Sequence, residues 1–514
     1  MKNVSVRKSA ILESFSIPHD IAYSIEAVQE ANLAVYYNPL YWACACLSVD
    51  AGSSNTAFDS YDEDAEGDEE NPEDVLESYE MVEDENGIKK PAVVTNYGKV
   101  ARAISNIQGQ GYKVFLPDIN EAQSDFRVDT KRDGILYGMS AIISMNADII
   151  SDIISHRPYT SLSDFLSKVT LTTVQMISLI KAGAFDELEG KSRFYIMDQY
   201  LRYNAEQKIA KKEKLTMANY DKALELDIIP DQFTMQVKMT FFNKWIDKNC
   251  QGLDASGKKI YTLTAQDEIK FFSVIVENSL TKGKDYDIIP NGYIVKVSPF
   301  KKFYDVYCTP MKEWMLTEEA TNTMYEAEIA QKVNEWKTKY CQGTLSKWEM
   351  DSLSYYYAPH ELAGINNAKY KIVNFNSLPE QPIPIGTKKN ARTGVEYPQY
   401  NMVRIAGTVL NADKAKHIVT VLTVYGVVDV KFYKMAFINY NKRISKVDEK
   451  GKKTVIEGSW FTRGNILLIN GLRKENMFSP RRDFTPGGYN TSVSLVTGIN
   501  GGDLVLKHHR EKGV

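Results

Sequence analysis

The stretch from Tyr97 to Leu188 alternates short apolar segments with turns so regularly that it can form only small helices and a few short strands. It opens with an apolar stripe at helical spacing, and Gly111 ends that stripe. A short apolar run then leads into Pro117, and a second stripe of isoleucines follows at residues 149–154. This spacing predicts a compact module of helices joined by hairpins, and such modules commonly grip the backbone of a nucleic acid.

The net charge of −4 conceals an uneven distribution of charge along the chain. Fifteen acidic residues and no Lys or Arg fall between Asp59 and Glu85. Without them, the 62 Lys and Arg residues face 51 acidic residues, which leaves a net charge of +11. A body of that charge suits a polyanion such as DNA, whereas residues 50–92 are predicted to be a solvated, disordered insert.

Residue usage excludes several classes of protein. No run of eighteen or more apolar residues occurs, and the first eight residues lack the apolar core of a secretory signal, so we expect a cytoplasmic protein without a membrane-spanning helix. The six histidines do not cluster with carboxylates at a metal-ligand spacing. None of the five cysteines forms a Cys-x-x-Cys pair, which argues against a zinc site or a disulfide framework. The five are Cys44, Cys46, Cys250, Cys308 and Cys341.

Four phrases of the central stretch occur in an order that is typical of one protein family. They are Pro117-Asp118-Ile119-Asn120, Ile135-Leu136-Tyr137-Gly138, Ser161 to Phe165, and Leu179 to Asp186. This order closely resembles the end of the fingers and the helix-hairpin-helix region of the C-family bacterial replicative DNA polymerases, the DNA polymerase III alpha subunits. The resemblance implies tandem hairpins that hold duplex DNA without reading its sequence.

The two hairpins carry the residues that the resemblance places nearest to DNA. In the first, Ser144 and Asn146 stand where the family has glycines, whose backbone N–H groups approach a phosphate closely. We expect Asn146 to cap the helix that starts at Ala147, and the phosphate grip of this hairpin to be weaker or relocated. The second hairpin keeps Lys181 and Gly183. The predicted DNA contacts of the module are therefore Ser144, Asn146, Lys181 and Gly183.

The first 49 residues resemble the last large helices of the family's fingers, on the order of His19, Tyr23 and Pro39. Ile17 and Ala34 stand where the family has lysines that face nucleotide and DNA. Their replacement argues against a direct nucleotide contact from these helices.

From Val403 onward the pattern changes to short alternating strands separated by glycine turns. The predicted strands are residues 403–409, 417–425, 427–433, 460–461 and 466–471. Five such strands indicate an OB-type β-barrel, and the phrase that opens it is also found in the family. Charged and aromatic residues interleave here, as the binding of single-stranded template requires, although about half of them must face the core. The predicted DNA contacts are Lys431, Tyr433, Arg463 and Arg473.

Two phrases are similar to the short peptides with which replication proteins bind a sliding clamp. The first contains Gln236, Met239 and Phe241, and the second contains Gln266, Ile269 and Phe271. Because this pattern often arises by chance, core positions of a helix are the preferred interpretation of both.

The carboxylates that the family needs for catalysis are missing from this chain. Polymerases of this family hold two magnesium ions with palm carboxylates in a Pro-Asp-x-Asp-x-Asp phrase that precedes the fingers. The similar phrase Asp285-Tyr286-Asp287 follows the hairpins instead, so its order is wrong. We therefore predict no catalytic residue, no metal and no bound cofactor here, and expect Mg²⁺ on a partner subunit.

The predicted fold class is multidomain α+β, with helical and hairpin regions followed by a mixed region and a barrel. The predicted domains are the fingers helices (1–49), the acidic insert (50–92), the fingers end with tandem hairpins (93–190), a divergent mixed region with a possible clamp contact (191–345), a connector (346–400), the OB-fold (401–480) and a tail (481–514).

The predicted function is that of the C-terminal part of a split, phage-type replicative polymerase. It would bind primer–template duplex and single-stranded template, and a separate palm-bearing subunit would supply the chemistry. A sliding clamp is a further candidate partner. The alternative is a non-catalytic DNA-binding accessory protein of replication.

Overall fold

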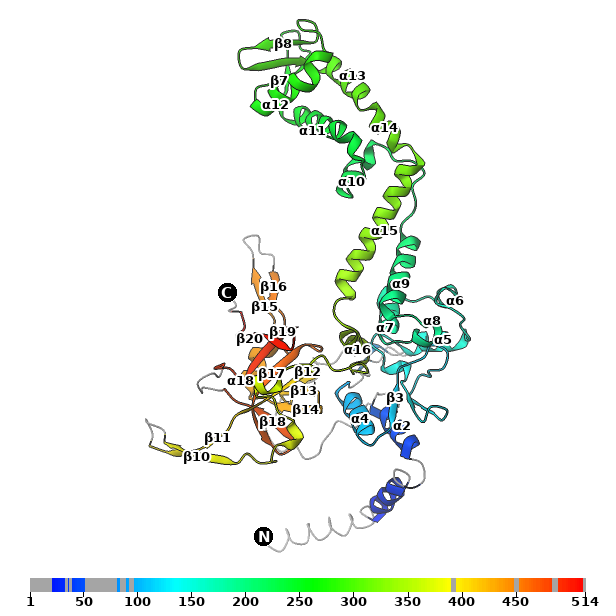
Figure 1. Cartoon of the computed structure of the whole chain (residues 1–514), viewed down its shortest axis with the longest axis vertical. Coiled ribbons are helices and arrows are strands. Elements are labelled where there is room, and N and C mark those ends of the chain that lie inside the picture. Colours follow the sequence, from blue (N-terminus) through cyan, green and yellow to red (C-terminus); the bar gives the residue numbers. More distant parts are fainter. Residues whose placement is uncertain are drawn as a thin grey trace. The chain divides into compact units, whose positions relative to one another are not determined.

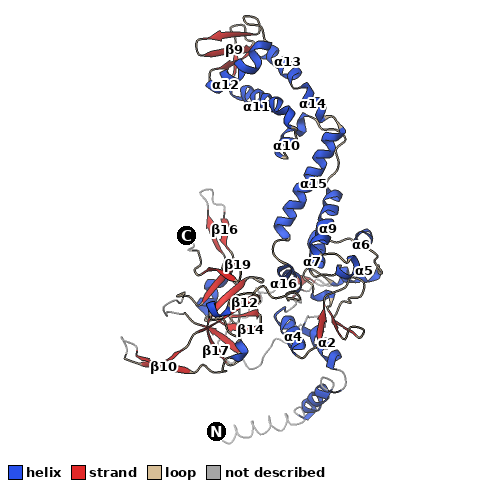
Figure 2. Cartoon of the chain, in the orientation of Figure 1, coloured by secondary structure: helices blue, strands red, loops and turns tan. Residues whose placement is uncertain are grey.

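The computed structural model describes residues 21–32, 36, 39–50, 81–83, 89–91, 97–389, 394–447, 453–482 and 489–511 (Figures 1 and 2). The chain divides into two compact units. The first comprises Met1–Met197 and Gly343–Val514, and the second comprises Asp198–Gln342. Most of the predicted acidic insert lies outside the described residues, as do Ile17, His19 and Ala34.

The first unit begins with helices that resemble the predicted fingers helices in position. Residues 21–32 are helical, and α2 (Pro39–Asp50) packs against α4 (Tyr97–Gly109). The predicted stripe on α4 is confirmed, because Val100, Ala101, Ile104 and Ile107 are all buried. Between these helices the short strands β1 (Met81–Glu83) and β2 (Lys89–Pro91) pair antiparallel.

The hairpin module follows α4 and starts with a small three-stranded sheet. Its strands are β3 (Lys113–Phe115), β4 (Arg127–Asp129) and β5 (Gly134–Leu136), with β5 in the middle. Short helices come next: η2 (Met139–Ala141), α5 (Ala147–Ser155), α6 (Leu162–Lys168), α7 (Thr173–Lys181) and α8 (Asp186–Glu189). The helices α5, α6 and α7 begin at Asn146, Ser161 and Thr172, whose side-chain oxygens each accept a hydrogen bond from the first turn.

Two segments connect this module to the second unit and to the barrel. The helix α9 (Arg193–Lys208) leaves the module, and α16 (Leu345–Leu353) returns to it. After α16 come α17 (Asn367–Tyr370), η7 (Phe375–Ser377) and the antiparallel ribbon of β10 (Pro384–Lys389) and β11 (Glu396–Tyr400).

A closed five-stranded barrel forms the C-terminal part of the first unit. Its strands are β12 (Val403–Asp413), β13 (Ile418–Thr423), β14 (Gly426–Lys431), β17 (Ile466–Lys474) and β18 (Met477–Pro480). They pair in the order β12-β13-β14-β18-β17, and β17 pairs back with β12 to close the ring. The pairing of β14 with β18 is parallel and the others are antiparallel. The OB-like barrel expected from the sequence is therefore present.

Two expectations for this region were wrong. Trp460 and Phe461 do not form a strand but lie in a turn, and both rings fill the barrel core. The fifth strand is β18 instead. Residues 493–507, which were expected to lie in a tail, form β19 (Val493–Asn500) and β20 (Asp503–Lys507), and these extend the sheet from β17. Their alternating apolar residues complete a second small core outside the barrel. The helix α18 (Lys434–Asn441) and the ribbon of β15 (Ile444–Val447) and β16 (Lys453–Glu457) separate β14 from β17.

The second unit combines helices with one antiparallel sheet. Its helices are α10 (Tyr220–Glu225), α11 (Thr234–Asn249), α12 (Gln266–Phe271), α13 (Val297–Tyr307), α14 (Thr309–Met315) and α15 (Glu318–Tyr340), with short helical turns at η3 (Met217–Asn219), η4 (Asp231–Phe233), η5 (Phe272–Val276) and η6 (Glu277–Ser279). The strands β6 (Gln251–Leu253), β7 (Lys259–Leu263), β8 (Tyr286–Ile289) and β9 (Gly292–Lys296) pair in the order β6-β7-β9-β8.

A hairpin turn at Asn291-Gly292 joins β8 to β9. Gly292 has a φ of +150°, and a Cβ at this position would lie 1.8 Å from the carbonyl oxygen of Leu263. Only glycine can occupy the position, because β7 runs directly beside it. In the described part of the chain, no helix combines the length and the apolar character that crossing a membrane requires.

His360 is a packed residue in the turn after α16. Its Nε2 lies 3.0 Å from the Leu422 carbonyl oxygen of β13, and its Nδ1 accepts a hydrogen bond from the Leu362 N–H at 3.0 Å. Burial lowers the pKa of the ring, with the carbonyl of Leu422 opposing that shift. The neutral ring therefore holds the turn after α16 against the barrel through its contact with Leu422.

We expect the first unit to lose stability as the pH falls below about 6.5, because the unfolded chain then binds a proton that the folded His360 resists. The variant His360→Gln can keep both hydrogen bonds but cannot titrate. Its melting temperature, followed between about pH 5 and pH 8, should fall less steeply on acidification than that of the original chain. His156→Gln is the matched control, because His156 is exposed; an equal change in both variants would contradict the assignment.

Candidate nucleic-acid interface

The first hairpin presents its turn to solvent. Ser144 is exposed and has a φ of +70°, so it holds the left-handed conformation that glycine would adopt more easily. The capping role expected for Asn146 is confirmed, since its Oδ1 accepts a hydrogen bond from the Ile149 N–H at 3.0 Å. Asp148 is exposed in the first turn of α5. Its carboxylate repels a phosphate from the amide end of this helix, so any backbone contact must come from the turn itself.

The second hairpin is buried rather than exposed. The Lys181 ammonium forms an ion pair with Asp351 at 2.9 Å and lies 5.9 Å from the centre of the Trp348 ring. Gly183 has a φ of +82°, and a Cβ there would lie 2.6 Å from Nη2 of Arg193. Lys181 thus holds α7 against α16 and does not present its charge to solvent, while Gly183 leaves room for the Arg193 guanidinium.

A buried arginine organises the contacts around this hairpin. The Arg193 side chain is 6% exposed. Its Nε donates to Asp186 at 2.8 Å, and its Nη1 donates both to Glu349 at 2.9 Å and to the Lys181 carbonyl oxygen at 3.1 Å. Burial raises the pKa of Asp186, and the Arg193 guanidinium opposes that shift. The cluster joins α8, α9 and α16 around one cation.

Glu349 is fully buried, and its second oxygen is also occupied. It accepts hydrogen bonds from the N–H groups of Tyr357 at 2.8 Å and Ala358 at 2.6 Å. The same carboxylate therefore pairs with Arg193 and shapes the turn after α16.

The turn after α16 contacts both the hairpin module and the barrel. The Tyr137 hydroxyl donates to the Leu353 carbonyl oxygen at 2.8 Å, and the Ile143 N–H donates to the Ser352 carbonyl oxygen at 2.9 Å. On the barrel side, the hydroxyls of Tyr356 and Thr408 lie 2.9 Å apart. One short segment consequently fixes the position of the first hairpin relative to the barrel.

Lys431 and Tyr433 lie together at the exposed end of β14. The Lys431 ammonium donates to the Lys416 carbonyl oxygen in the loop between β12 and β13. Tyr433 is 67% exposed, and the Arg481 guanidinium lies 4.9 Å from the centre of its ring. OB-folds bind single strands with the face of their second and third strands and with the adjoining loops. Arg481 was missed in the sequence because its partner Tyr433 is distant along the chain.

The other two barrel arginines make structural contacts. Arg463 donates to the Ser354 hydroxyl at 3.1 Å and lies 5.0 Å from the centre of the Tyr97 ring. Arg473 lies over the Phe375 ring and donates to the Leu378 carbonyl oxygen at 2.8 Å. The structure brings Lys431 and Tyr433 together and places these two arginines elsewhere.

Part of the β13–β14 face is covered by α4, which packs against both strands. Arg102 of α4 forms an ion pair with Asp429 of β14 at 2.7 Å. The Lys431–Tyr433 end of this face stays exposed, as does the turn at Val424 and Tyr425 at its other end.

Both clamp-like phrases lie in helices of the second unit. Met239 is fully buried, whereas Phe241 is 58% exposed, so the first phrase cannot place both side chains in a partner's pocket. In the second phrase Gln266 is exposed, and Phe271 packs against the core and stacks with Phe242 at 4.5 Å. Ile269 is partly buried. Met239 and Phe271 agree with the preferred interpretation of core helix positions, but the exposed Phe241 does not. Clamp binding stays a prediction.

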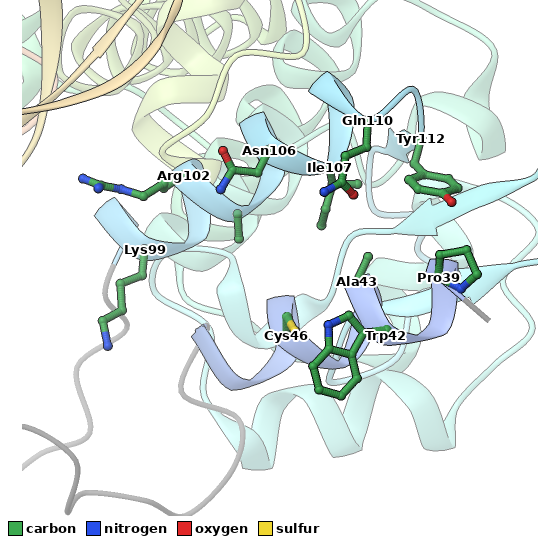
Figure 3. Close-up of a pocket in the computed structure, with 11 residues that line it drawn as sticks. Pro39, Trp42, Ala43, Cys46, Lys99, Arg102, Asn106, Ile107, Gln110 and Tyr112 are labelled. Carbon is green, nitrogen blue, oxygen red and sulfur yellow. The ribbon is translucent and has the colours of Figure 1, made fainter. Parts of the chain in front are cut away.

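A groove of about 730 Å³ lies between α2 and α4 (Figure 3). Trp42 and Cys46 line it from α2, and Lys99, Arg102 and Asn106 line it from α4. Since Arg102 already pairs with Asp429, its charge is partly satisfied within the chain. Among the described residues, no group of three His, Cys, Asp or Glu side chains comes close enough together to hold a metal ion.

Comparison with known proteins shows which proteins this chain is similar to. A helix-hairpin-helix motif matches residues 111–194. The chain is 37% identical over 503 residues to "Probable DNA polymerase YorL" of Bacillus subtilis and equally to "DNA-directed DNA polymerase" of Bacillus phage SPbeta. A "DNA polymerase III subunit alpha" of Xylella fastidiosa is 36% identical over 111 residues, or 20% of this chain and 9% of that relative. The chain resembles the C-terminal portion of a DNA polymerase III alpha subunit.

The extent of these matches differs between the two groups of relatives. The match to the Bacillus and phage polymerases covers 97% of this chain, and so includes the second unit, but only 35% of the length of those curated relatives. The likeness to the Xylella alpha subunit is confined to 20% of the chain. The second unit is therefore shared with the phage-type polymerases.

We expect Gly183→Ala to destabilise the first unit by about 3 kcal/mol or more, because a Cβ there displaces the Arg193 guanidinium and leaves Glu349 buried without its partner. Gly190→Ala is the matched control: its φ is +60°, but no atom lies within 4 Å of the added Cβ. That variant should lose only about 1 kcal/mol. Urea unfolding followed by tryptophan fluorescence measures both, and equal losses would show that Arg193 is not held as described.

Proposed function

We propose that this chain is the DNA-holding portion of a split DNA polymerase III alpha-like replicative polymerase. The observation that carries the proposal is the match to phage-type DNA polymerases, which runs through 97% of this chain. The matched portion contains a helix-hairpin-helix motif and an OB-like barrel, which are DNA-binding elements in many proteins. A separate palm-bearing polypeptide would supply the carboxylates and the two Mg²⁺ ions.

Two surfaces of the first unit would hold DNA. The exposed turn at Ser144 would contact the duplex backbone, while the exposed end of β14 would hold the single-stranded template. There, Tyr433 offers a ring face to a base, and Lys431 and Arg481 offer positive charge to phosphates. The buried cluster around Arg193 would fix the geometry of the two surfaces without touching DNA.

The N-terminal helix is the surface that we assign to the palm-bearing polypeptide. Ile21, Ile25 and Val28 lie on one face of residues 21–32 and are 56%, 55% and 60% exposed. A helix that exposes an apolar face normally buries it against another protein surface. The groove between α2 and α4, where Trp42 is partly exposed, is a second surface for the same partner. The part of the phage-type polymerases that has no counterpart here would cover both.

The purified chain is expected to bind a fluorescent primer–template with an affinity that falls steeply with salt, because Lys and Arg contacts release counterions from DNA. It should incorporate no nucleotide alone, and should do so once a polypeptide matching the rest of the phage polymerase is added with Mg²⁺. Fluorescence anisotropy and primer extension measure the two properties. Robust extension by this chain alone would refute the proposal.

Co-purification separates this function from the alternative of an accessory DNA-binding protein. A palm-bearing polypeptide that co-purifies through the N-terminal helix supports the split polymerase. Recovery of nucleic acid alone, with no gain of polymerase activity on mixing, would favour the accessory protein.

The barrel surface gives a second expected outcome. Tyr433→Ala should weaken binding of a single-stranded oligonucleotide by about 5-fold or more, since one stacked base contributes about 1–3 kcal/mol. Tyr195→Ala is the matched control, because Tyr195 is also 45% exposed but lies on α9, outside the barrel. Equal affinities of the two variants would remove Tyr433 from the interface.

A further inference from the structure

The exposed face of α11 in the second unit carries two aromatic rings between two lysines. Phe241 is 58% exposed and Trp245 is 56% exposed, and they are one helical turn apart. Lys238 and Lys248 are exposed on the same face, one turn before and one turn after the rings. We call these four residues the α11 stripe.

The α11 stripe is not part of the core of the second unit. The opposite face of the helix supplies Met239, Phe242 and Ile246 to a core that also contains residues of β7 and α13. That core is complete without the stripe. The rings of Phe241 and Trp245 are exposed to solvent, although the rest of α11 already anchors the helix. Exposed apolar clusters commonly mark binding sites, so these two rings indicate a bound ligand.

The Trp245 ring is fixed in place by a buried carboxylate. Its indole N–H donates to Oε1 of Glu268 at 2.8 Å, and Glu268 is 9% exposed. The other oxygen of Glu268 accepts hydrogen bonds from the N–H groups of Thr264 and Ala265, both at 3.2 Å. The polar edge of the indole is thus held inward while more than half of its surface stays exposed. Such a ring loses little conformational entropy when a planar group stacks on it.

Two exposed lysines flank the rings, and the carboxylate that contacts them, Glu268, is buried at the indole edge of Trp245. Lys238 and Lys248 are both exposed, so their ammonium groups can reach an anion in solvent. Lys244, which lies on the same helix, is already engaged: it pairs with Asp221 at 2.5 Å and lies 5.0 Å from the centre of the Tyr220 ring. The α11 stripe therefore presents two cations that can meet an anion and two rings that can meet a planar apolar group.

We infer that the α11 stripe is a binding site for single-stranded nucleic acid. Bases would stack on Phe241 and Trp245, and the flanking phosphates would approach Lys238 and Lys248. Ten residues of helix separate the two lysines, which corresponds to about 15 Å. Stacking on protein rings requires bases that are not already stacked in a duplex, so a single strand is favoured over duplex DNA. This site goes beyond the proposed function, since it lies in the second unit and is independent of the barrel.

Photo-crosslinking of the full-length chain to an oligonucleotide of 5-iodouridine tests the site. This base crosslinks to aromatic rings stacked on it, and mass spectrometry then identifies the modified peptide. We expect crosslinks at Phe241 or Trp245. The double variant Phe241→Ala/Trp245→Ala should lose them and bind the oligonucleotide at least 5-fold more weakly, while any crosslink at Tyr433 persists. Because both side chains are exposed, its circular dichroism and melting temperature should change little.

Two further variants keep the test decisive. Phe241→Tyr/Trp245→Phe retains both rings and should retain the crosslinks even without the bond to Glu268. Lys238→Ala/Lys248→Ala should reduce the salt dependence of binding. An unmodified α11 peptide at saturating oligonucleotide, or an unchanged affinity of the Ala/Ala variant, would overturn the inference. In that case crosslinks confined to the barrel would leave the proposed function intact and would point to a protein ligand for the α11 stripe.

Discussion

Arg193 keeps its guanidinium almost entirely away from water, and such a cation is stable only where acceptors surround it. Asp186, Glu349 and the Lys181 carbonyl oxygen provide them. Other contacts of the first unit depend on this pairing. Glu349 can shape the turn after α16 only while Arg193 neutralises it, and that turn in turn positions the first hairpin and the barrel. The surfaces assigned to DNA binding are thus held in place by buried residues that make no contact with DNA.

Much of the fold could be predicted because its determinants are local. The α4 stripe, the cap at Asn146 and the glycine turns of the barrel each depend on residues within one or two turns of one another. The ordered phrases around Pro117 and Phe185 added the hairpin module. The two large rings at Trp460 and Phe461 misled the strand prediction, because a buried turn and a buried strand can have the same composition.

The candidate site was less predictable because a side chain's role depends on distant partners. Lys181 and Arg473 had the right chemistry for DNA, yet Asp351 and Phe375 engage them in the fold. Arg481 and the α11 stripe show the reverse: their placement beside Tyr433 or on a solvent-facing helix surface carries no local signal. Polar residue type alone does not distinguish a lysine that meets phosphate from one that meets a carboxylate.

The contact between Arg193 and Glu349 also joins the two points between which the second unit is inserted. The chain leaves the first unit just after this arginine and returns just before this glutamate. The free energy of closing such a loop depends only weakly on its length, with each doubling costing about 0.6 kcal/mol. Phage polymerases could therefore enlarge, shorten or exchange this insertion while the first unit stays unaltered. New domains can be acquired at this position.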